Sequence, residues 1–292
     1  MPTSRHHATA AAVCLTLAIT GCSTGKLRPL PAAAFSKVVL PPGSTQPFDA
    51  IRGDLLKDID DSLRRYDYRC AAAAGFTPTP ISKVREPFHD LKFREGDFGT
   101  TDLEVARRDG LLAGGELIDP SNEAPNQTAR TAEEIARCDR KARALLTKDT
   151  TAAYDDYMSL ANDLASQYFT KMSTQYQPFR LRLFTCVETK GWHADDRTAL
   201  SNDADLRKHY RVATAQPRVN AATGKETYLP TQNETSLAVA LATCRQQTGY
   251  SRNVFARSRQ IQGQIVAVNE AKLAEGNARL AQAAAETASR LA

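Results

Sequence analysis

The sequence predicts a mainly α-helical protein: a helical body of two related units, each held by a disulfide, with a few short strands and a long C-terminal helix. Three observations predict this fold. Apolar residues recur at steps of three and four, three cysteines are each followed by glycine and an aromatic residue at the same spacing, and residues 251–292 are rich in alanine and free of proline. With 292 residues, 42% hydrophobic and 24% charged, the chain is long enough for one large or two small globular domains.

Residues 1–21 have the layout of a secretory signal peptide, in which a positive start precedes an apolar run. Arg5 supplies the positive charge, and the apolar run extends from Ala8 to Thr20. This run is shorter than the roughly 18–20 residues that a membrane-spanning helix needs. We therefore expect the chain to be exported and the leader to be removed.

The leader ends in Ile19, Thr20, Gly21 and Cys22. This sequence resembles the lipobox of bacterial lipoproteins: an aliphatic residue, a small residue, Gly or Ala, and the cysteine that receives the lipid. The resemblance implies a mature chain that starts at Cys22, with diacylglycerol on its thiol and a further acyl chain such as palmitate on its amine. Two or more chains make a stable anchor. In this family Ser23, a residue other than Asp, implies the periplasmic face of the outer membrane; an ordinary signal peptide with an incidental cysteine is the alternative.

Residues 22–46 are predicted to be a flexible, lipid-anchored tether. Prolines and glycines are frequent here, and they disfavour a helix. In a polyproline conformation the tether would reach at most roughly 75 Å, at about 3.1 Å per residue. Within it, residues 35–40 could form a short strand that docks on the body.

Residues 47–177 are predicted to form the first helical unit. Its first helix starts near Pro47, follows an apolar stripe, and ends at Gly75 as the C-cap. The irregular stretch that follows has room for short strands at residues 81–84 and 89–93.

Two further helices complete this unit. Thr131 and Glu134 form a capping box that opens a helix carrying Cys138. A second helix carries a stripe of Tyr and Met residues from Tyr154 to Met172, which we expect in the core.

Residues 178–250 are predicted to form the second unit. One helix is expected from Pro178 to Lys190, although the alternation of Phe179, Leu181 and Leu183 would also suit a strand. A later helix is capped by Asn233 or Thr235.

The chain closes with residues 251–292, which as a single helix would be about 63 Å long. Apolar residues become sparse after Leu273. This weak seam suggests an extended arm, a coiled-coil partner helix or a frayed tail.

One pattern occurs three times: a cysteine, four residues, a glycine and an aromatic residue. It predicts helix C-termini at which the glycine takes the left-handed conformation and the aromatic side chain folds back over the last turns. The three copies are Cys70 with Gly75 and Phe76, Cys186 with Gly191 and Trp192, and Cys244 with Gly249 and Tyr250.

Cys138 lacks this ending, but like Cys244 it lies on a capped helix. The chain therefore reads as two related units, which favours Cys70–Cys138 and Cys186–Cys244 among the three connectivities that four cysteines allow. Export to an oxidising compartment supports disulfides. Free buried thiols and a zinc site are the alternatives, although zinc sites usually need two cysteines close in sequence.

Charge and motifs exclude several classes of function. The formal charge is +5 and the basic residues are interleaved with acidic ones, so we expect no nucleic-acid partner. The chain has no hydrolase, nucleotide-binding or metalloprotease motif, and we expect no cofactor and no metal.

Histidine beside a carboxylate occurs at two places downstream of the leader. His89 precedes Asp90, and His193 is followed closely by Asp195 and Asp196. Such pairs can serve acid–base catalysis, and they equally suit a solvated loop, the interpretation that we favour.

The expected function is that of a non-enzymatic protein-interaction or envelope-assembly module, with the membrane contacted through lipid on Cys22 and a protein partner in the periplasm. An immunity lipoprotein that neutralises a toxin or hydrolase in the periplasm is one alternative. An envelope enzyme with a site assembled from dispersed residues is the other.

Overall fold

The structure is a computed structural model. It describes residue 30 and residues 34–76, 86–112, 129–195, 203–213, 218–219, 226–227 and 229–292. Within these residues the protein is mainly α-helical, as predicted. The α-helices are α1 (Gly53–Ala73), α2 (Leu103–Asp109), α3 (Ala129–Leu145), α4 (Lys148–Gln175), α5 (Gln177–Glu188), α6 (Asp203–His209), α7 (Gln232–Thr248) and α8 (Tyr250–Arg290). The 3-10 helices are η1 (Pro47–Ala50), η2 (His89–Leu91), η3 (Glu95–Phe98) and η4 (Gly110–Leu112), and the strands β1 (Arg218–Val219) and β2 (Glu226–Thr227) pair antiparallel.

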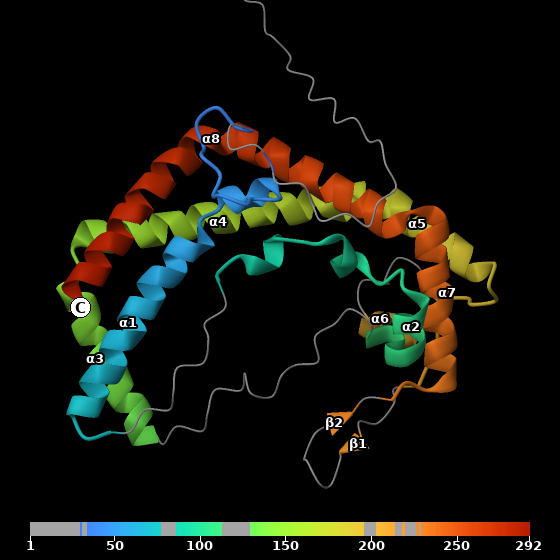
Figure 1. The fold of residues 1–292 in the computed structure, drawn as a ribbon, viewed down its shortest axis with the longest axis horizontal. Coiled ribbons are helices and arrows are strands. Elements are labelled where there is room, and N and C mark those ends of the chain that lie inside the picture. Colours follow the sequence, from blue (N-terminus) through green and yellow to red (C-terminus); the bar gives the residue numbers. More distant parts are fainter. Residues whose placement is uncertain are drawn as a thin grey trace, which may run out of the picture.

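The described helices form an arch (Figure 1). Helices α4 and α8 run along its length, α1 and α3 lie side by side at one end, and α2, α6 and α7 gather at the other. The C-terminus lies at the end occupied by α1 and α3. No helix in the described part of the chain has both the length and the apolar character that crossing a membrane requires.

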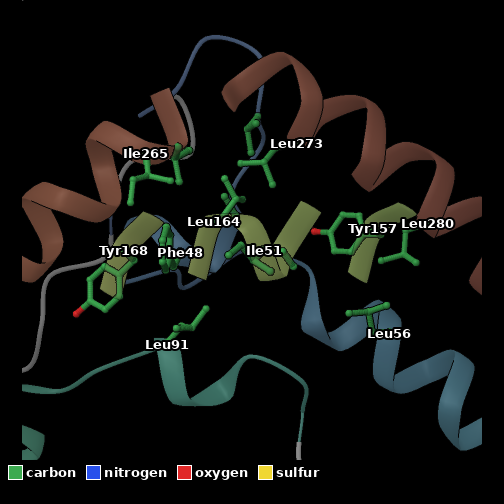
Figure 2. Packing of buried hydrophobic residues seen from close by; sticks show 14 of the residues in the cluster. Phe48, Ile51, Leu56, Leu91, Tyr157, Leu164, Tyr168, Ile265, Leu273 and Leu280 are labelled. Atoms are coloured by element: carbon green, nitrogen blue, oxygen red, sulfur yellow. The ribbon is translucent and has the colours of Figure 1, made fainter. Parts of the chain in front are cut away.

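The first hydrophobic core joins α1, α3, α4, α8 and η1. Figure 2 shows α8 running along one side of α4, and Leu164 of α4, Phe48 of η1 and Leu273 of α8 belong to one cluster. These three side chains are fully buried. Burying a side chain of this size contributes about 1.5–3 kcal/mol, so this core is a major source of the stability of the arch.

Polar contacts fix how the helices of this core are aligned. The Tyr157 hydroxyl donates to Asn277 Oδ1 at 2.6 Å and accepts from the Arg52 amide at 2.8 Å. The Asn277 side-chain amide donates to the carbonyl of Ala50 at 3.2 Å. Since Tyr157 is only 2% exposed, breaking either bond would leave a buried polar group unpaired, which costs about 1–3 kcal/mol.

The second core joins α2, α5, α6, α7 and η4. Its fully buried side chains include Val187 of α5 and Leu237 of α7, and Ala106 of α2 packs with them. Helix α2 and η4 thus precede α3 in sequence but belong to the core at the far end of the arch. The second core therefore includes segments from both sides of α3 and α4 in the sequence. The sequence pattern instead predicts two successive units, divided between residues 177 and 178.

Glu234 organises the start of α7. Its backbone amide donates to Thr231 Oγ1 at 3.2 Å, so Thr231 is the N-cap and the prediction of Asn233 or Thr235 is wrong. Its buried carboxylate lies 3.0 Å from Arg207 Nη2 and accepts from the Leu111 amide at 3.1 Å. A fully buried carboxylate needs such partners, and these bonds join α6 and η4 to α7.

Helix α8 is the long C-terminal helix that the sequence predicts, but it is neither an arm nor a frayed tail. Leu273 and Leu280 are fully buried, and Leu291 is 3% exposed. The alanine-rich seam packs along α4 and α1 of its own chain. The helix bends near its middle (Figure 1), where the Asn269 side-chain amide donates to the carbonyl of Ile265 at 2.9 Å. A side chain bonded into the helix ladder in this way is a recognised cause of bending.

The predicted tether is partly wrong, because residues 34–46 pack on the body. Val38 and Leu40 are buried in the first core, and the Leu30 amide donates to the carbonyl of Ser44 at 2.7 Å. Glu270 of α8 accepts from the Lys37 amide at 2.5 Å. No strand forms at residues 35–40. The backbone amides of Lys37 and Val38 donate to the carboxylate of Glu270, and not to a second strand.

Two other expectations are also wrong. Helix α3 already includes Ala129, so Thr131 lies inside it, and Glu134 bonds Arg137 instead of capping the helix. Residues 89–93 contain η2 and not a strand, and the Leu91 carbonyl accepts from the side chain of Gln262 at 3.1 Å. The strand expected at residues 81–84 lies outside the described residues.

Candidate functional site

The structure forms the two disulfides that the repeated pattern predicts. Cys70 of α1 is joined to Cys138 of α3, and Cys186 of α5 is joined to Cys244 of α7, with Cα–Cα distances of 5.9 and 5.7 Å. Each bond links two helices of one core. Because the bonds close loops of 68 and 58 residues, each contributes about 4 kcal/mol in the chain-entropy model.

The first two copies of the cysteine pattern are helix ends of the predicted kind. Gly75 has a φ of +84° and Gly191 a φ of +85°. The Phe76 amide donates to the Ala71 carbonyl at 3.1 Å, the long-range bond that defines a Schellman motif. The Trp192 amide makes the equivalent bond to Val187 at 3.4 Å, and the Trp192 ring packs edge-on against Tyr210.

The third copy is a helix junction. Gly249 has a φ of +62° and connects α7 directly to α8. Tyr250 is the first residue of α8 and packs against both cores. The pattern therefore predicts where a helix ends, but it does not predict that another helix follows at once.

The described residues contain one group of side chains close enough to ligate a metal ion, and two of its three members form a disulfide with each other. The group consists of Cys70, Glu134 and Cys138. Both sulfurs are bonded to each other, so neither is a thiolate ligand, and Glu134 is paired with Arg137. The donor set therefore does not suit zinc while the disulfide is intact.

The two histidine–carboxylate pairs lie apart. His89 is half-buried in η2, whereas His193 is exposed after α5. Asp195 is bonded to Arg211 through both carboxylate oxygens, each at 3.0 Å. Asp196 lies outside the described residues, as does Cys22.

A cavity of about 710 Å³ lies between the two cores. Its walls come from η3, α4, α5, α7 and the start of α8. No histidine is among the described lining residues, which are Phe93, Gly96, Asp97, Phe98, Gly99, Thr100, Gly110, Leu111, Tyr168, Phe169, Met172, Ser173, Tyr176, Arg180, Leu183, Phe184, Leu206, Ala238, Leu241, Arg245, Tyr250 and Val254.

Four aromatic rings make a continuous apolar wall. Phe93 lies 5.5 Å from Phe98 and 5.6 Å from Tyr168, measured between ring centroids. Phe169 meets Tyr168 edge-on at 5.3 Å and is 52% exposed. These distances are typical of favourable aromatic pairs.

A second group of lining residues is polar. Arg180 is 5% exposed, donates to the Tyr176 hydroxyl at 3.2 Å, and lies over the rings of Tyr176 and Phe184. The pKa of Tyr250 is raised to about 12, mainly by burial and also by the neighbouring Tyr176. The charges of Arg245 and Arg180 lower this pKa in part. The group therefore combines two guanidinium cations with two phenol hydroxyls, of which that of Tyr250 is held in its neutral form.

The backbone at Gly99 brings one of these cations to the wall. Gly99 has a φ of +97°, and a Cβ there would lie 2.3 Å from Arg245 Cζ. Sequence reasoning missed this site, because its walls come from segments up to 161 positions apart, between Phe93 and Val254. The one local signal was a glycine between Phe98 and Thr100 in an otherwise irregular stretch.

Comparisons with models of known families, with characterised proteins and with solved structures find no match to this chain.

Proposed function

We propose that this protein is a lipoprotein, anchored through Cys22 to the periplasmic face of the outer membrane, and that its disulfide-bonded body acts as a non-enzymatic interaction module. The observation that carries the proposal is the pair of disulfides, Cys70–Cys138 and Cys186–Cys244. Stable disulfides occur mainly in exported proteins. This agrees with the lipobox-like sequence at Cys22.

The docked N-terminal segment brings the body close to the proposed anchor. Leu30 is bonded to Ser44, and Glu270 holds residues 36–38 against α8. Only eight residue steps separate Cys22 from Leu30, and a fully extended chain spans about 3.3–3.6 Å per residue. Leu30 would therefore lie within about 30 Å of the acylated residue.

Two observations favour binding over catalysis. The described lining of the cavity has aromatic and cationic side chains but no histidine. The carboxylate of Asp195, the nearest acid downstream of His193, is occupied by Arg211. An interaction module needs a rigid body, and the disulfides and two cores supply one.

Acyl labelling and fractionation test the anchor. Wild type expressed with its own leader is expected to incorporate labelled palmitate and to fractionate with the outer membrane. Cys22→Ser is expected to lose the label and keep its leader, or to become soluble. Cys14→Ser, which changes the other cysteine of the leader, is the matched control and should behave as wild type. Labelling that persists in Cys22→Ser would disprove the anchor.

Capture from envelope extracts tests the interaction role. The acylated chain is expected to retain one envelope protein in near-stoichiometric amount, and that protein should capture this chain in return. Recovery of a lipidated monomer with no such partner would disprove the interaction role while leaving the anchor intact.

A further inference from the structure

We propose that the cavity between the two cores binds a single-chain organic anion, a molecule with an apolar body and one anionic headgroup. The inference goes beyond the proposed function and does not depend on acylation of Cys22. It rests on the size of the cavity, on its division into an aromatic and a cationic part, and on the charge of its walls.

The volume suits a small molecule. Sites for small ligands usually enclose about 300–1,000 Å³, and this cavity has about 710 Å³. Its walls belong to both cores, so a bound molecule would contact α4 and α8 on one side and α5 and α7 on the other.

The aromatic part of the cavity suits the apolar body. Phe93, Phe98 and Tyr168 form one continuous set of ring contacts, and Met172 extends this surface along α4. Moving an acyl or aryl group from water onto such a surface is favourable because it removes apolar area from water.

The cationic part suits the headgroup. Arg180 and Arg245 are the only bases among the described lining residues, and Asp97 is the only acid. Asp97 is exposed, and its carboxylate already accepts from the Arg94 amide at 2.6 Å. The balance of charge on the described walls is therefore positive, which favours an anion over a cation of the same shape.

Both guanidiniums have other interactions within the protein. Arg245 Nη1 donates to the Thr100 carbonyl at 3.4 Å, and the Arg245 side chain packs on Gly99. The proposal requires their positive charge at the wall and not a vacant donor. An anion placed beside Tyr176 and Tyr250 would also accept hydrogen bonds from their hydroxyl groups.

Calorimetric titration tests the ligand class. The sample is the mature chain, residues 22–292, with Cys22→Ser and with both disulfides verified by mass mapping. The probes are dodecanoate, dodecanol and dodecyltrimethylammonium, each below its micelle concentration. Dodecanoate is expected to bind at one site per chain, at least tenfold more tightly than dodecyltrimethylammonium. Equal affinities, no binding, or many sites per chain would overturn the proposal.

Two variants place the ligand in the cavity. Ser173 is an exposed lining residue on α4, so Ser173→Trp should block the cavity without disturbing a core and weaken dodecanoate binding at least tenfold. Thr174→Trp changes the adjacent exposed residue, which does not line the cavity, and should bind as the parent does. Unchanged binding by Ser173→Trp would exclude this cavity.

A third variant tests the headgroup. Arg245→Met keeps an unbranched apolar stem and removes the guanidinium charge, so it should weaken dodecanoate binding about tenfold and leave dodecanol binding unchanged. Arg182→Met, on the exposed face of α5, is the control. An equal loss for both ligands would show that Arg245 acts only through packing and would overturn the assignment of the headgroup. Membrane fractionation of these variants stays as in wild type, so failure here is distinct from failure of the proposed anchor.

Discussion

Asp67 carries a buried carboxyl group on α1. It is 6% exposed, and its Oδ1 has no hydrogen-bond partner among the described residues. Burial raises the pKa of this group to about 6, and Asp139 of α3 adds to the rise, while Arg143 and Arg64 oppose it. The folded protein therefore binds this proton more tightly than the unfolded chain, whose carboxyl group titrates near 3.8. Stability from this residue is complete below about pH 4 and is lost as the pH rises through about 6.

Replacing Asp67 with Asn removes the titrating carboxyl group, and with it the loss of stability as the pH rises through about 6. Two pKa units correspond to about 3 kcal/mol, so Asp67→Asn is expected to raise the free energy of unfolding by at most about 3 kcal/mol at pH 7.5 and to change it little at pH 4. Urea unfolding at both pH values measures this. Asp155→Asn, at an exposed position on α4, is the control. A gain of equal size at both pH values would contradict the titration.

The glycines at the helix ends allow a second test at this scale. Gly75 has a φ of +84°, and no atom lies within 4 Å of the position that a Cβ would take, so only backbone strain opposes a side chain there. Gly75→Ala is expected to lower the free energy of unfolding by about 1–2 kcal/mol. Gly96→Ala, also with open space but without a positive φ, should have a smaller effect. Equal effects in urea unfolding would count against the left-handed cap.

At the scale of elements, the sequence predicts the helices better than their boundaries. Apolar spacing locates α1 and α4 because each helix buries one continuous stripe. The start of α7 is misplaced by two residues or more, since Thr231, Asn233 and Thr235 all have side chains able to cap a helix. The strand expected at residues 89–93 is wrong because Phe88 takes a left-handed φ of +63° and the backbone turns so that the Leu91 amide donates to the Phe88 carbonyl, features that the residue pattern does not signal. The cavity could not be predicted, since it exists only once both cores are assembled.

Helix α8 offers a direct test of its packing. Leu280 is fully buried against the first core, so Leu280→Ala is expected to lower the free energy of unfolding by about 2–5 kcal/mol. Leu181→Ala, at a position 58% exposed on α5, should change it by less than about 0.5 kcal/mol. Chemical denaturation compares the two. A negligible loss for Leu280→Ala would mean that the end of α8 is not docked.

At the scale of the whole molecule, we expect the docked N-terminal segment to orient the arch relative to the proposed anchor. The segment around Val39 is fastened to the bend of α8, and Val39 itself is 77% exposed. Trp192 lies beyond the end of α5, where it packs against the second core. A short link from Cys22 to Leu30 would place Val39 nearer the bilayer than Trp192.

Energy transfer to dansyl-labelled lipids measures this orientation. The acylated wild-type protein has Trp192 as its only tryptophan. A double variant, Val39→Trp with Trp192→Phe, moves the donor to the segment beside α8. It is expected to transfer energy more efficiently than wild type in the same vesicles. Weaker transfer from position 39 would reverse the proposed orientation.

Helix α8 follows all the other described elements along the chain, yet it supplies Ile261, Ile265, Leu273 and Leu280 to the first core. That core cannot close until nearly the whole chain is available. A polypeptide passed through a membrane from its N-terminus would thus be unable to complete the first core during transit. It would reach its final shape only on the far side, after its last helix had emerged.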